Sequence, residues 1–300
     1  MSLERPKKPK ILVVDDEPDN LDLLYRTFRR NFQVLRAESG AEALSVLATE
    51  GEVAVIISDQ RMPQMKGTEF LSQTVPQFPD TVRIILTGFT DVEDLVEAIN
   101  SGQVYKYITK PWDAKHLIEL VQTAVETYEV LKQRTEEIHL ANVQKALLAT
   151  ILQVAQEADN LVSCLIAIAK PFAESFAADC CILQVVEDNQ LIAEQGSYTK
   201  LQTIENSLEK DPLIPEVLSN QKLIVWTNAP PAKSPDVAEY YQNIGIKMHL
   251  LVPVLYRGEV LTILSLQWQE KRQPLPEEQL QLIHLLAQQL GLVLTMIRSS

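Results

Sequence analysis

Positive charge is scarce in this chain of 300 residues, because 27 Lys and Arg stand against 40 Asp and Glu and leave a formal net charge of −13. Such a chain has no electrostatic footprint for DNA or RNA, so we expect no nucleic-acid partner. No window approaches the roughly eighteen uninterrupted apolar residues of a membrane span, and no signal peptide precedes the first expected strand. We therefore expect a cytoplasmic protein that does not associate with a membrane.

Cysteine is also rare. The only three are Cys164, Cys180 and Cys181, which lack metal-ligand spacing. An odd count that includes an adjacent pair fits a reducing compartment better than a disulfide framework. They fall on the expected first helices and first strand of the second half, where we predict that they are core residues.

The first half of the chain alternates short apolar runs with amphipathic segments. Buried strands are predicted at residues 11–14, 33–37, 54–58, 83–86 and 105–109, with helices between them, the fourth at 91–100. Five strand–helix alternations with short links predict the α/β class, with a five-stranded, doubly wound parallel sheet.

Polar side chains follow four of these strands. Asp15 and Asp16 end the first, Asp59 the third, Thr87 the fourth and Lys110 the fifth. A single Asp after a strand is more simply a turn or capping residue, but the carboxyl ends of neighbouring parallel strands converge on one crevice. Crowded carboxylates repel one another, and Mg²⁺ relieves that repulsion. Together with a hydroxyl and an ammonium, they predict transfer of a phosphoryl group onto Asp59.

These motifs resemble the receiver domain of two-component response regulators. The resemblance covers residues 9 to about 127 and rests on Asp15-Asp16-Glu17, Asp59 with Arg61-Met62-Pro63, Thr87-Gly88 and Lys110-Pro111. It implies that Asp59 is the phospho-acceptor. It also implies that Asp15, Asp16 and Asp59 hold Mg²⁺ with the backbone carbonyl of Arg61, and that a cognate sensor histidine kinase or phosphotransfer protein is the partner.

The same resemblance assigns roles on the last two strands. Thr87 would form a hydrogen bond to the phosphoryl group, and Lys110 would form an ion pair with it. The peptide bond between Lys110 and Pro111 is expected to be cis. Tyr107 stands where the family keeps a switch aromatic. The alternative for Tyr107 is an ordinary half-buried strand tyrosine.

From Asp113 the chain turns helical, with no Pro or Gly between Ala114 and Leu165. Apolar residues recur at three- and four-residue steps, and forty helical residues would reach about 60 Å. The stripe needs a second surface, which favours a parallel coiled coil in a homodimer. The alternative is a helix that folds back on its own domains, with a break at Asp159 and Asn160.

The order of elements changes in the second half. Helices come first, then strands, including two around the turn Arg257-Gly258, and a closing helix at 275–298. This order predicts an α+β domain with an antiparallel sheet covered by helices. The segments Leu148-x-x-Ile151, Ala178-Asp179-x-Cys181 and Leu250-Leu251-Val252-Pro253-Val254 resemble a GAF domain over about 147–298. That family binds small molecules or dimerises.

The stretch Glu239-Tyr240-Tyr241 resembles GAF domains of cyanobacterial phytochrome-type photoreceptors. Asp236 holds the place of their covalent cysteine, and Leu213 replaces the thiol of a second cysteine motif. A covalent bilin is therefore not expected, and we find no convincing cyclic-nucleotide signature. The GAF ligand stays unknown. Trp226, Tyr240, Tyr241 and His249 are pocket candidates, although such residues are more often core or interface aromatics.

The sequence thus predicts a lead-in at 1–8, a receiver domain at 9–127, a signalling helix at 128–146 and a GAF domain at 147–298. We expect a phospho-accepting response regulator whose only chemistry is its own phosphorylation and dephosphorylation. Two alternatives stay open at this point: the regulatory part of a larger kinase, cyclase or phosphodiesterase, and a small-molecule or bilin sensor driven by the GAF domain.

Overall fold

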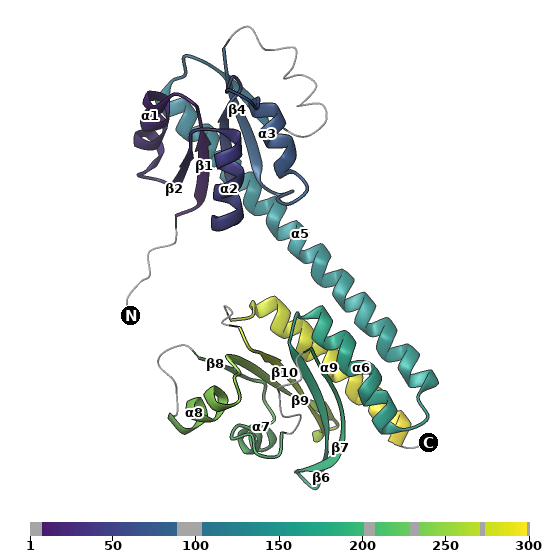
Figure 1. The fold of residues 1–300 in the computed structure, drawn as a ribbon. Coiled ribbons are helices and arrows are strands. Elements are labelled where there is room, and N and C mark those ends of the chain that lie inside the picture. Colours follow the sequence, from purple (N-terminus) through teal and green to yellow (C-terminus); the bar gives the residue numbers. More distant parts are fainter. Residues whose placement is uncertain (1–7, 89–103, 201–207, 229–234, 271–273, 299–300) are drawn as a thin grey trace. The chain divides into compact units, whose positions relative to one another are not determined.

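The computed structural model describes residues 8–88, 104–200, 208–228, 235–270 and 274–298 (Figure 1). It divides into two compact units, Met1–Glu137 and Ile138–Ser300. The helix predicted at 91–100 lies outside the described residues.

The first unit is built on a parallel sheet with the strand order β2-β1-β3-β4-β5. Its strands are β1 (Lys10–Val14), β2 (Gln33–Ala37), β3 (Val55–Asp59), β4 (Val82–Thr87) and β5 (Lys106–Thr109), and its described helices are α1 (Pro18–Phe28), α2 (Gly40–Glu50), α3 (Gly67–Thr74) and the start of α5 (Ala114–Glu157). The predicted parallel five-stranded sheet is confirmed.

Helices cover both faces of this sheet, which explains why its central strands are apolar throughout. Alternate residues of β1 enter two cores: Ile11 and Val13 pack with α1 and α5, whereas Leu12 and Val14 pack with α2 and α3. Every residue of β3 and β4 is buried, as expected for strands covered on both sides. Because both faces are covered, a ligand can reach this sheet only at the ends of its strands, where the polar residues lie.

Helix α5 runs unbroken for 44 residues, about 66 Å at 1.5 Å per residue, as the absence of Pro and Gly predicted. Its apolar stripe is divided: Leu117 and Val121 belong to a core of the first unit, and Leu147 and Ile151 to a core of the second. Between them, Ile138 is 53% exposed in the single chain. Pairing of α5 with a second copy therefore stays a prediction.

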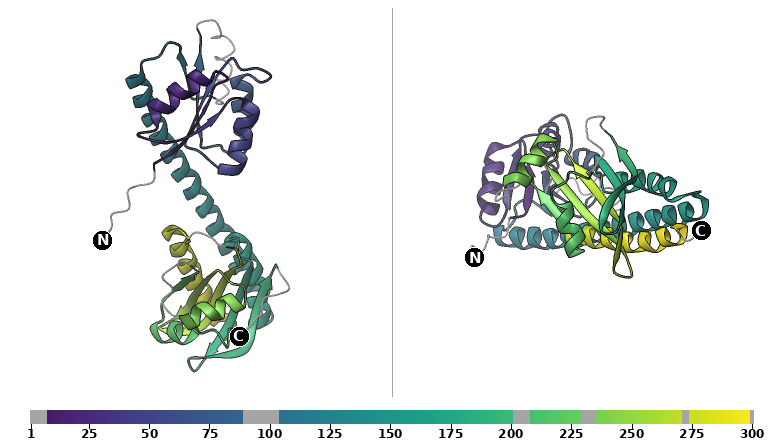
Figure 2. Two further views of the ribbon diagram at one scale, coloured as in Figure 1. Left: turned by 60° about the vertical axis from the view of Figure 1, so that its left-hand side comes forward. Right: turned by 90° about the horizontal axis from the view of Figure 1, so that it is seen from below.

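The second unit carries an antiparallel sheet with the strand order β7-β6-β10-β9-β8. Its strands are β6 (Cys180–Glu187), β7 (Gln190–Thr199), β8 (Ile224–Thr227), β9 (Met248–Tyr256) and β10 (Glu259–Trp268). Helices α6 (Leu161–Ser175) and α9 (Glu277–Arg298) and the end of α5 share one large core with the sheet (Figure 2). The predicted α+β architecture is confirmed.

Smaller clusters lie on the other face of this sheet, under α7 (Ile214–Asn220) and α8 (Pro235–Asn243). The sequence prediction missed α7, a short helix with Pro215 in its first turn. The predicted β9–β10 hairpin is present, with positive φ at Arg257 and Gly258. All three cysteines are buried and free, as predicted.

Candidate functional site

The carboxyl ends of β1, β3 and β5 bring Asp15, Asp59 and Lys110 together. Val14 lies opposite Ser58 in the β1–β3 pairing, so the residues that follow them, Asp15 and Asp59, are neighbours. The ammonium of Lys110 forms ion pairs with both carboxylates, at 3.1 Å from Asp15 Oδ2. Both aspartates are buried, with 1% and 6% of their surface exposed. This is the convergence that the order of motifs predicted.

Each aspartate is oriented by further hydrogen bonds. Asp15 Oδ1 accepts hydrogen bonds from the backbone N–H of Glu17 at 3.0 Å and from Asn20 Nδ2 at 3.1 Å. Asp59 Oδ2 accepts one from the backbone N–H of Arg61 at 2.7 Å. Asn20 was not predicted as part of the site, because no local sequence pattern links it to Asp15.

The loop after Asp59 is held close to it by Gly67 and Gln60. A Cβ at Gly67 would lie 2.2 Å from the carbonyl oxygen of Asp59, so only glycine allows α3 to begin there. The side chain of Gln60 accepts a hydrogen bond from the backbone N–H of Thr68 at 3.1 Å. The supporting role of Gln60 was not predicted.

Burial raises the pKa of Asp59, and the neighbouring charge of Asp15 adds to the rise. Hydrogen bonding and charge attraction from Lys110, and the N–H of Arg61, oppose it without cancelling it. Burial alone would lower the pKa of Lys110, but Asp59 and Asp15 together raise it. The site therefore holds a firmly cationic lysine between two crowded carboxyl groups, and an added cation would relieve the remaining repulsion.

Thr87 and Tyr107 lie on the neighbouring strands β4 and β5. Thr87 is 1% exposed, and its hydroxyl donates to the carbonyl oxygen of Gly88 at 3.0 Å. Tyr107 is 36% exposed. The backbone N–H of Lys110 donates to the carbonyl oxygen of Thr87 at 2.8 Å, which fixes the strand ends side by side. The peptide bond between Lys110 and Pro111 is cis, as predicted.

The carboxylate oxygens at the carboxyl ends of these strands suit Mg²⁺ as metal ligands. Within the described residues, no three His, Cys, Asp or Glu side chains form a cluster that would hold a metal alone. Mg²⁺ does not require such a cage, because it commonly takes one or two carboxylates together with waters and phosphate oxygens. Asp15 and Asp59 are buried at the crevice, and Asp16 follows directly as a half-buried carboxylate. These carboxylate oxygens are hard ligands of the kind that Mg²⁺ prefers.

The four pocket candidates of the second unit also come together. The rings of Trp226 and Tyr241 lie 4.3 Å apart between centroids, and those of Tyr240 and His249 each lie 5.3 Å from the ring of Tyr241. Tyr241 and His249 are fully buried, and Trp226 is 9% exposed. They form an aromatic cluster between α8 and the sheet.

A polar network runs through this cluster. The Tyr241 hydroxyl donates to Asp211 at 2.8 Å, and His249 Nδ1 lies 2.9 Å from the same hydroxyl. His249 Nε2 lies 2.7 Å from Ser265 Oγ. Neither Asp211 nor Ser265 was predicted as a site residue, since no local pattern links residues so far apart in the chain.

The network determines how its acid titrates. Burial alone would raise the pKa of Asp211, but hydrogen bonds and charge attraction from His249, with bonds from the Leu213 N–H and the Tyr241 hydroxyl, lower it overall. Burial and the neighbouring Asp211 raise the pKa of Tyr241. The phenol therefore stays protonated and donates to the ionised carboxylate.

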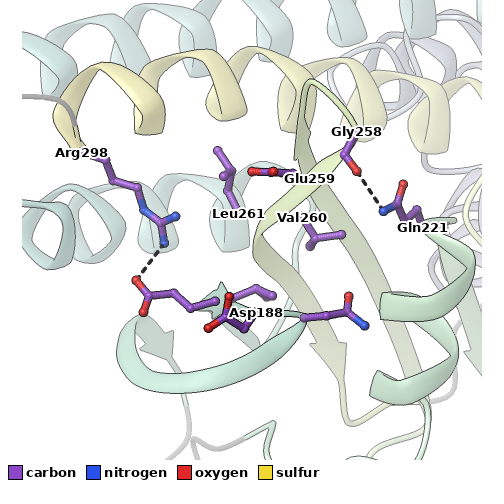
Figure 3. A pocket seen from close by; sticks show the side chains of 10 residues that line it. Asp188, Gln221, Gly258, Glu259, Val260, Leu261 and Arg298 are labelled. Atoms are coloured by element: carbon purple, nitrogen blue, oxygen red, sulfur yellow. Dashed lines mark hydrogen bonds and ion pairs between the residues drawn. The ribbon is translucent and has the colours of Figure 1, made fainter.

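A separate cleft of about 460 Å³ opens at one end of the second sheet (Figure 3). Three acids and Arg298 are among the residues that line it, and Arg298 lies 3.9 Å from Glu187. Gln221 Nε2 donates to the carbonyl oxygen of Gly258 at 3.0 Å across its wall. The four pocket candidates do not line this cleft.

Comparison with known proteins identifies both units. A model described as "Response regulator receiver domain" matches residues 11–122, and one described as "GAF domain" matches residues 145–295. The hydrogenase transcriptional regulatory protein HoxA of Cupriavidus necator is 44% identical over 120 residues, which is 40% of this chain and 25% of that protein. The transcriptional regulatory protein GlrR of Escherichia coli is 38% identical over 121 residues, 40% of this chain and 27% of that protein.

The solved structures that match each cover less than half of this chain. A structure titled adenylate cyclase from Rhodopirellula baltica shares 32% identity, with a TM-score of 0.43, and covers 44% of this chain and 97% of its own. A receiver domain protein from Clostridium thermocellum shares 30% identity, with a TM-score of 0.39, and covers 41% and 98%. The chain spans about a quarter of the length of the curated relatives above. It belongs to the GAF domain family and carries a response regulator receiver domain ahead of its GAF domain.

Proposed function

We propose that this chain is a phospho-accepting response regulator in which Asp59 receives the phosphoryl group. The observation that carries the proposal is the pairing of two buried carboxylates, Asp15 and Asp59, with the single ammonium of Lys110 at the carboxyl ends of three parallel strands. The site leaves the charge of Asp59 incompletely compensated, which suits a carboxylate that must attack an electrophile.

In the proposed reaction an oxygen of Asp59 attacks the phosphorus of a phosphohistidine on the partner kinase or phosphotransfer protein. A P–O bond forms while the P–N bond breaks, and the imidazole leaves with the electron pair and takes up a proton. Lys110 then exchanges part of its contact with Asp59 for a phosphoryl oxygen, and the Thr87 hydroxyl turns to donate to another. When bound, Mg²⁺ neutralises charge on the phosphoryl oxygens. Asp15, Asp16, Asp59 and the carbonyl of Arg61 would hold it.

Helix α5 offers a physical route from this site to the GAF domain. Its first turn comes soon after β5 in the chain. Two contacts hold its middle near the amino ends of β3 and β4: Lys132 to Glu52 at 2.7 Å, and Thr135 to Asp80 at 2.8 Å. A rearrangement of Thr87 and Tyr107 on phosphorylation would alter the contacts of α5 with the sheet. In a homodimer paired through α5, that shift would change the geometry of the dimer and hence of the two GAF domains.

A second candidate function is small-molecule sensing by the GAF domain. It is favoured by the aromatic and polar cluster of Trp226, Tyr240, Tyr241 and His249 beneath α8. Leu213 and Asp236 supply no thiol, so a bilin would have to bind without a covalent bond. A visible absorbance band or a ligand that co-purifies with the protein would support this candidate, and a spectrum of protein alone would count against it.

Phosphorylation by a small donor such as acetyl phosphate tests the main proposal. With Mg²⁺, the wild-type chain should gain one phosphoryl group by intact mass; chelation of Mg²⁺ or Asp59→Asn should abolish the gain. Lys110→Ala should slow it by about 10²-fold, since an electrostatic contact to the reacting group is lost. Lys115→Ala, an exposed lysine on α5, is the matched control and should behave as wild type. Equal rates in the two lysine variants would contradict the role of Lys110.

A further inference from the structure

Asn20 connects the first turn of α1 to the run of three acidic residues that follows β1. Its amide nitrogen Nδ2 donates hydrogen bonds to Asp15 Oδ1 at 3.1 Å and to Glu17 Oε2 at 3.0 Å. One neutral side chain thus bridges the first and the last carboxylate of the run. The proposed transfer of a phosphoryl group to Asp59 gives neither this bridge nor Glu17 a role.

The bridge differs from an ordinary helix cap. A capping side chain accepts hydrogen bonds from the free backbone N–H groups of the first turn, whereas the Asn20 amide donates to carboxylates. Glu17, at the N-cap position of α1, makes no side-chain capping hydrogen bond. The backbone N–H of Asn20 already donates to the carbonyl oxygen of Glu17 at 3.1 Å. The amide of Asn20 therefore orders the acidic side chains rather than the backbone of the helix.

The first consequence is a fixed orientation of Asp15. Its Oδ1 accepts hydrogen bonds from Asn20 and from the backbone N–H of Glu17, which leaves Oδ2 to pair with the ammonium of Lys110 at 3.1 Å. Asp15 is also buried, with 1% of its surface exposed. A carboxylate whose partners are already in place loses little conformational freedom when a metal ion binds beside it.

The second consequence concerns Asp16, the middle carboxylate of the run. It is half-buried, and it forms no hydrogen bond or ion pair with another residue in the part of the chain that the structure describes. Asn20 lowers the repulsion between Asp15 and Glu17 without bringing a positive charge, which would repel Mg²⁺. The bridge thus leaves Asp16 as the carboxylate of the run that is free to bind a metal ion.

We propose that Asn20 is a positioning residue for the metal ion, which strengthens Mg²⁺ binding by bridging Asp15 and Glu17. The inference rests on the proposed function, because the same ion serves the phosphorylation of Asp59. Loss of a hydrogen-bond partner of a metal ligand typically weakens metal binding by about 10- to 100-fold. Because Asn20 leaves the oxygens of Asp16 untouched, we expect the lower end of that range.

Binding of Mn²⁺ to the full chain tests the proposal directly. Mn²⁺ takes the same hard oxygen ligands as Mg²⁺, and the electron paramagnetic resonance signal of the free ion measures how much is bound. Asn20→Ala should weaken binding by about tenfold. Asn20→Leu, which keeps the size of the side chain and removes the amide, should weaken it equally. Asn142→Ala, at an exposed asparagine on α5, is the matched control and should bind as wild type. Wild-type affinity in either Asn20 variant would overturn the proposal.

Labelling by acetyl phosphate separates metal binding from the reaction. In Asn20→Ala the Mg²⁺ concentration that gives half-maximal labelling should rise by about tenfold, while the rate at saturating Mg²⁺ stays within about twofold of wild type. A merely structural role would lower labelling at every Mg²⁺ concentration, and that result would contradict the proposal. Normal labelling of the wild-type chain together with unchanged Mn²⁺ affinity in Asn20→Ala would refute only the role of Asn20. A wild-type chain that neither binds Mn²⁺ nor is labelled would refute the phospho-acceptor site as well.

Discussion

The two units each contain a buried aspartate beside a basic side chain, and the two acids respond to burial in opposite ways. Asp59 is 6% exposed and pairs with Lys110, whereas Asp211 is 4% exposed and lies 3.3 Å from His249. The pKa of Asp59 is raised and that of Asp211 is lowered. Burial pushes both upward, so the difference comes from their partners.

Asp211 receives a full set of donors in a closed environment: the Leu213 N–H at 2.9 Å, the Tyr241 hydroxyl at 2.8 Å, and His249. Asp59 shares its one ammonium with a second carboxylate, Asp15. The first arrangement is complete and stabilises the fold, while the second keeps a repulsion that an incoming metal ion or phosphoryl group would relieve. Incomplete compensation at an edge of the sheet therefore distinguishes the candidate reaction site from a structural network.

Among the variants that test this difference between Asp59 and Asp211, Asp211→Asn should change the free energy of unfolding the most. The substitution removes the buried negative charge shared by the Tyr241 hydroxyl and His249 and replaces one acceptor oxygen with an amide N–H₂, so the free energy of unfolding should fall by about 3 kcal/mol. Urea unfolding monitored by tryptophan fluorescence measures it. Asp236→Asn, at an exposed aspartate on α8, is the control and should change stability by less than about 0.5 kcal/mol. Equal effects would mean that the network does not stabilise the fold.

Tyr241→Phe should cost somewhat less. It removes only the hydroxyl that links Asp211 to His249 and retains the ring against Trp226. A lost hydrogen bond to a buried charge predicts a decrease of about 2 kcal/mol in the free energy of unfolding. Tyr240→Phe, in the adjacent half-buried tyrosine, gives the comparison and should be the milder of the two.

Asp59→Asn should have the opposite sign. Because the folded-state pKa of Asp59 lies above its usual value, its neutral form is favoured in the fold, and a neutral amide should raise the free energy of unfolding at pH 7 by about 1 kcal/mol. Loss of stability in this variant under the same urea protocol would show that the pairing with Lys110 outweighs the cost of burial and the repulsion from Asp15.

The smallest expected effect is a change with pH in the stability differences between these variants and the wild type. The deficit of Asp211→Asn should be complete above pH 3.8, the ordinary value for Asp, and should diminish as pH falls through the lowered pKa of Asp211. The gain of Asp59→Asn should be complete above the raised pKa of Asp59 and should diminish as pH falls toward 3.8. Unfolding of the variants and wild type between pH 7 and 3 measures both, and pH-independent differences would contradict this linkage.

The first unit could be predicted further than the second, for a physical reason. Parallel strands end at one edge, so Asp15, Asp59 and Lys110 could be placed together from the order of strands alone. The cis bond at Pro111 and the unbroken α5 were predicted as well. The network of Asp211, Tyr241, His249 and Ser265 could not be foreseen, because its members come from a turn, a helix and two antiparallel strands.

Short elements were also beyond prediction. Helix α7 has only 7 residues, too few for an apolar period to be recognised, and β7 continues to Thr199 through residues of mixed polarity. Likewise Asn20 and Gln60, which orient Asp15 and the loop after Asp59, belong to no pattern that is visible before the chain is folded.

The most direct measurement locates the phosphoryl group itself. The full chain is treated with acetyl phosphate and Mg²⁺, the acyl phosphate is reduced with borohydride, and peptides are analysed by mass spectrometry. We expect that Asp59 alone is converted to homoserine, in the wild-type chain and in Asp211→Asn alike. Conversion at Asp15 or Asp16, or no conversion in the wild-type chain, would contradict the claim that Asp59 is the acceptor.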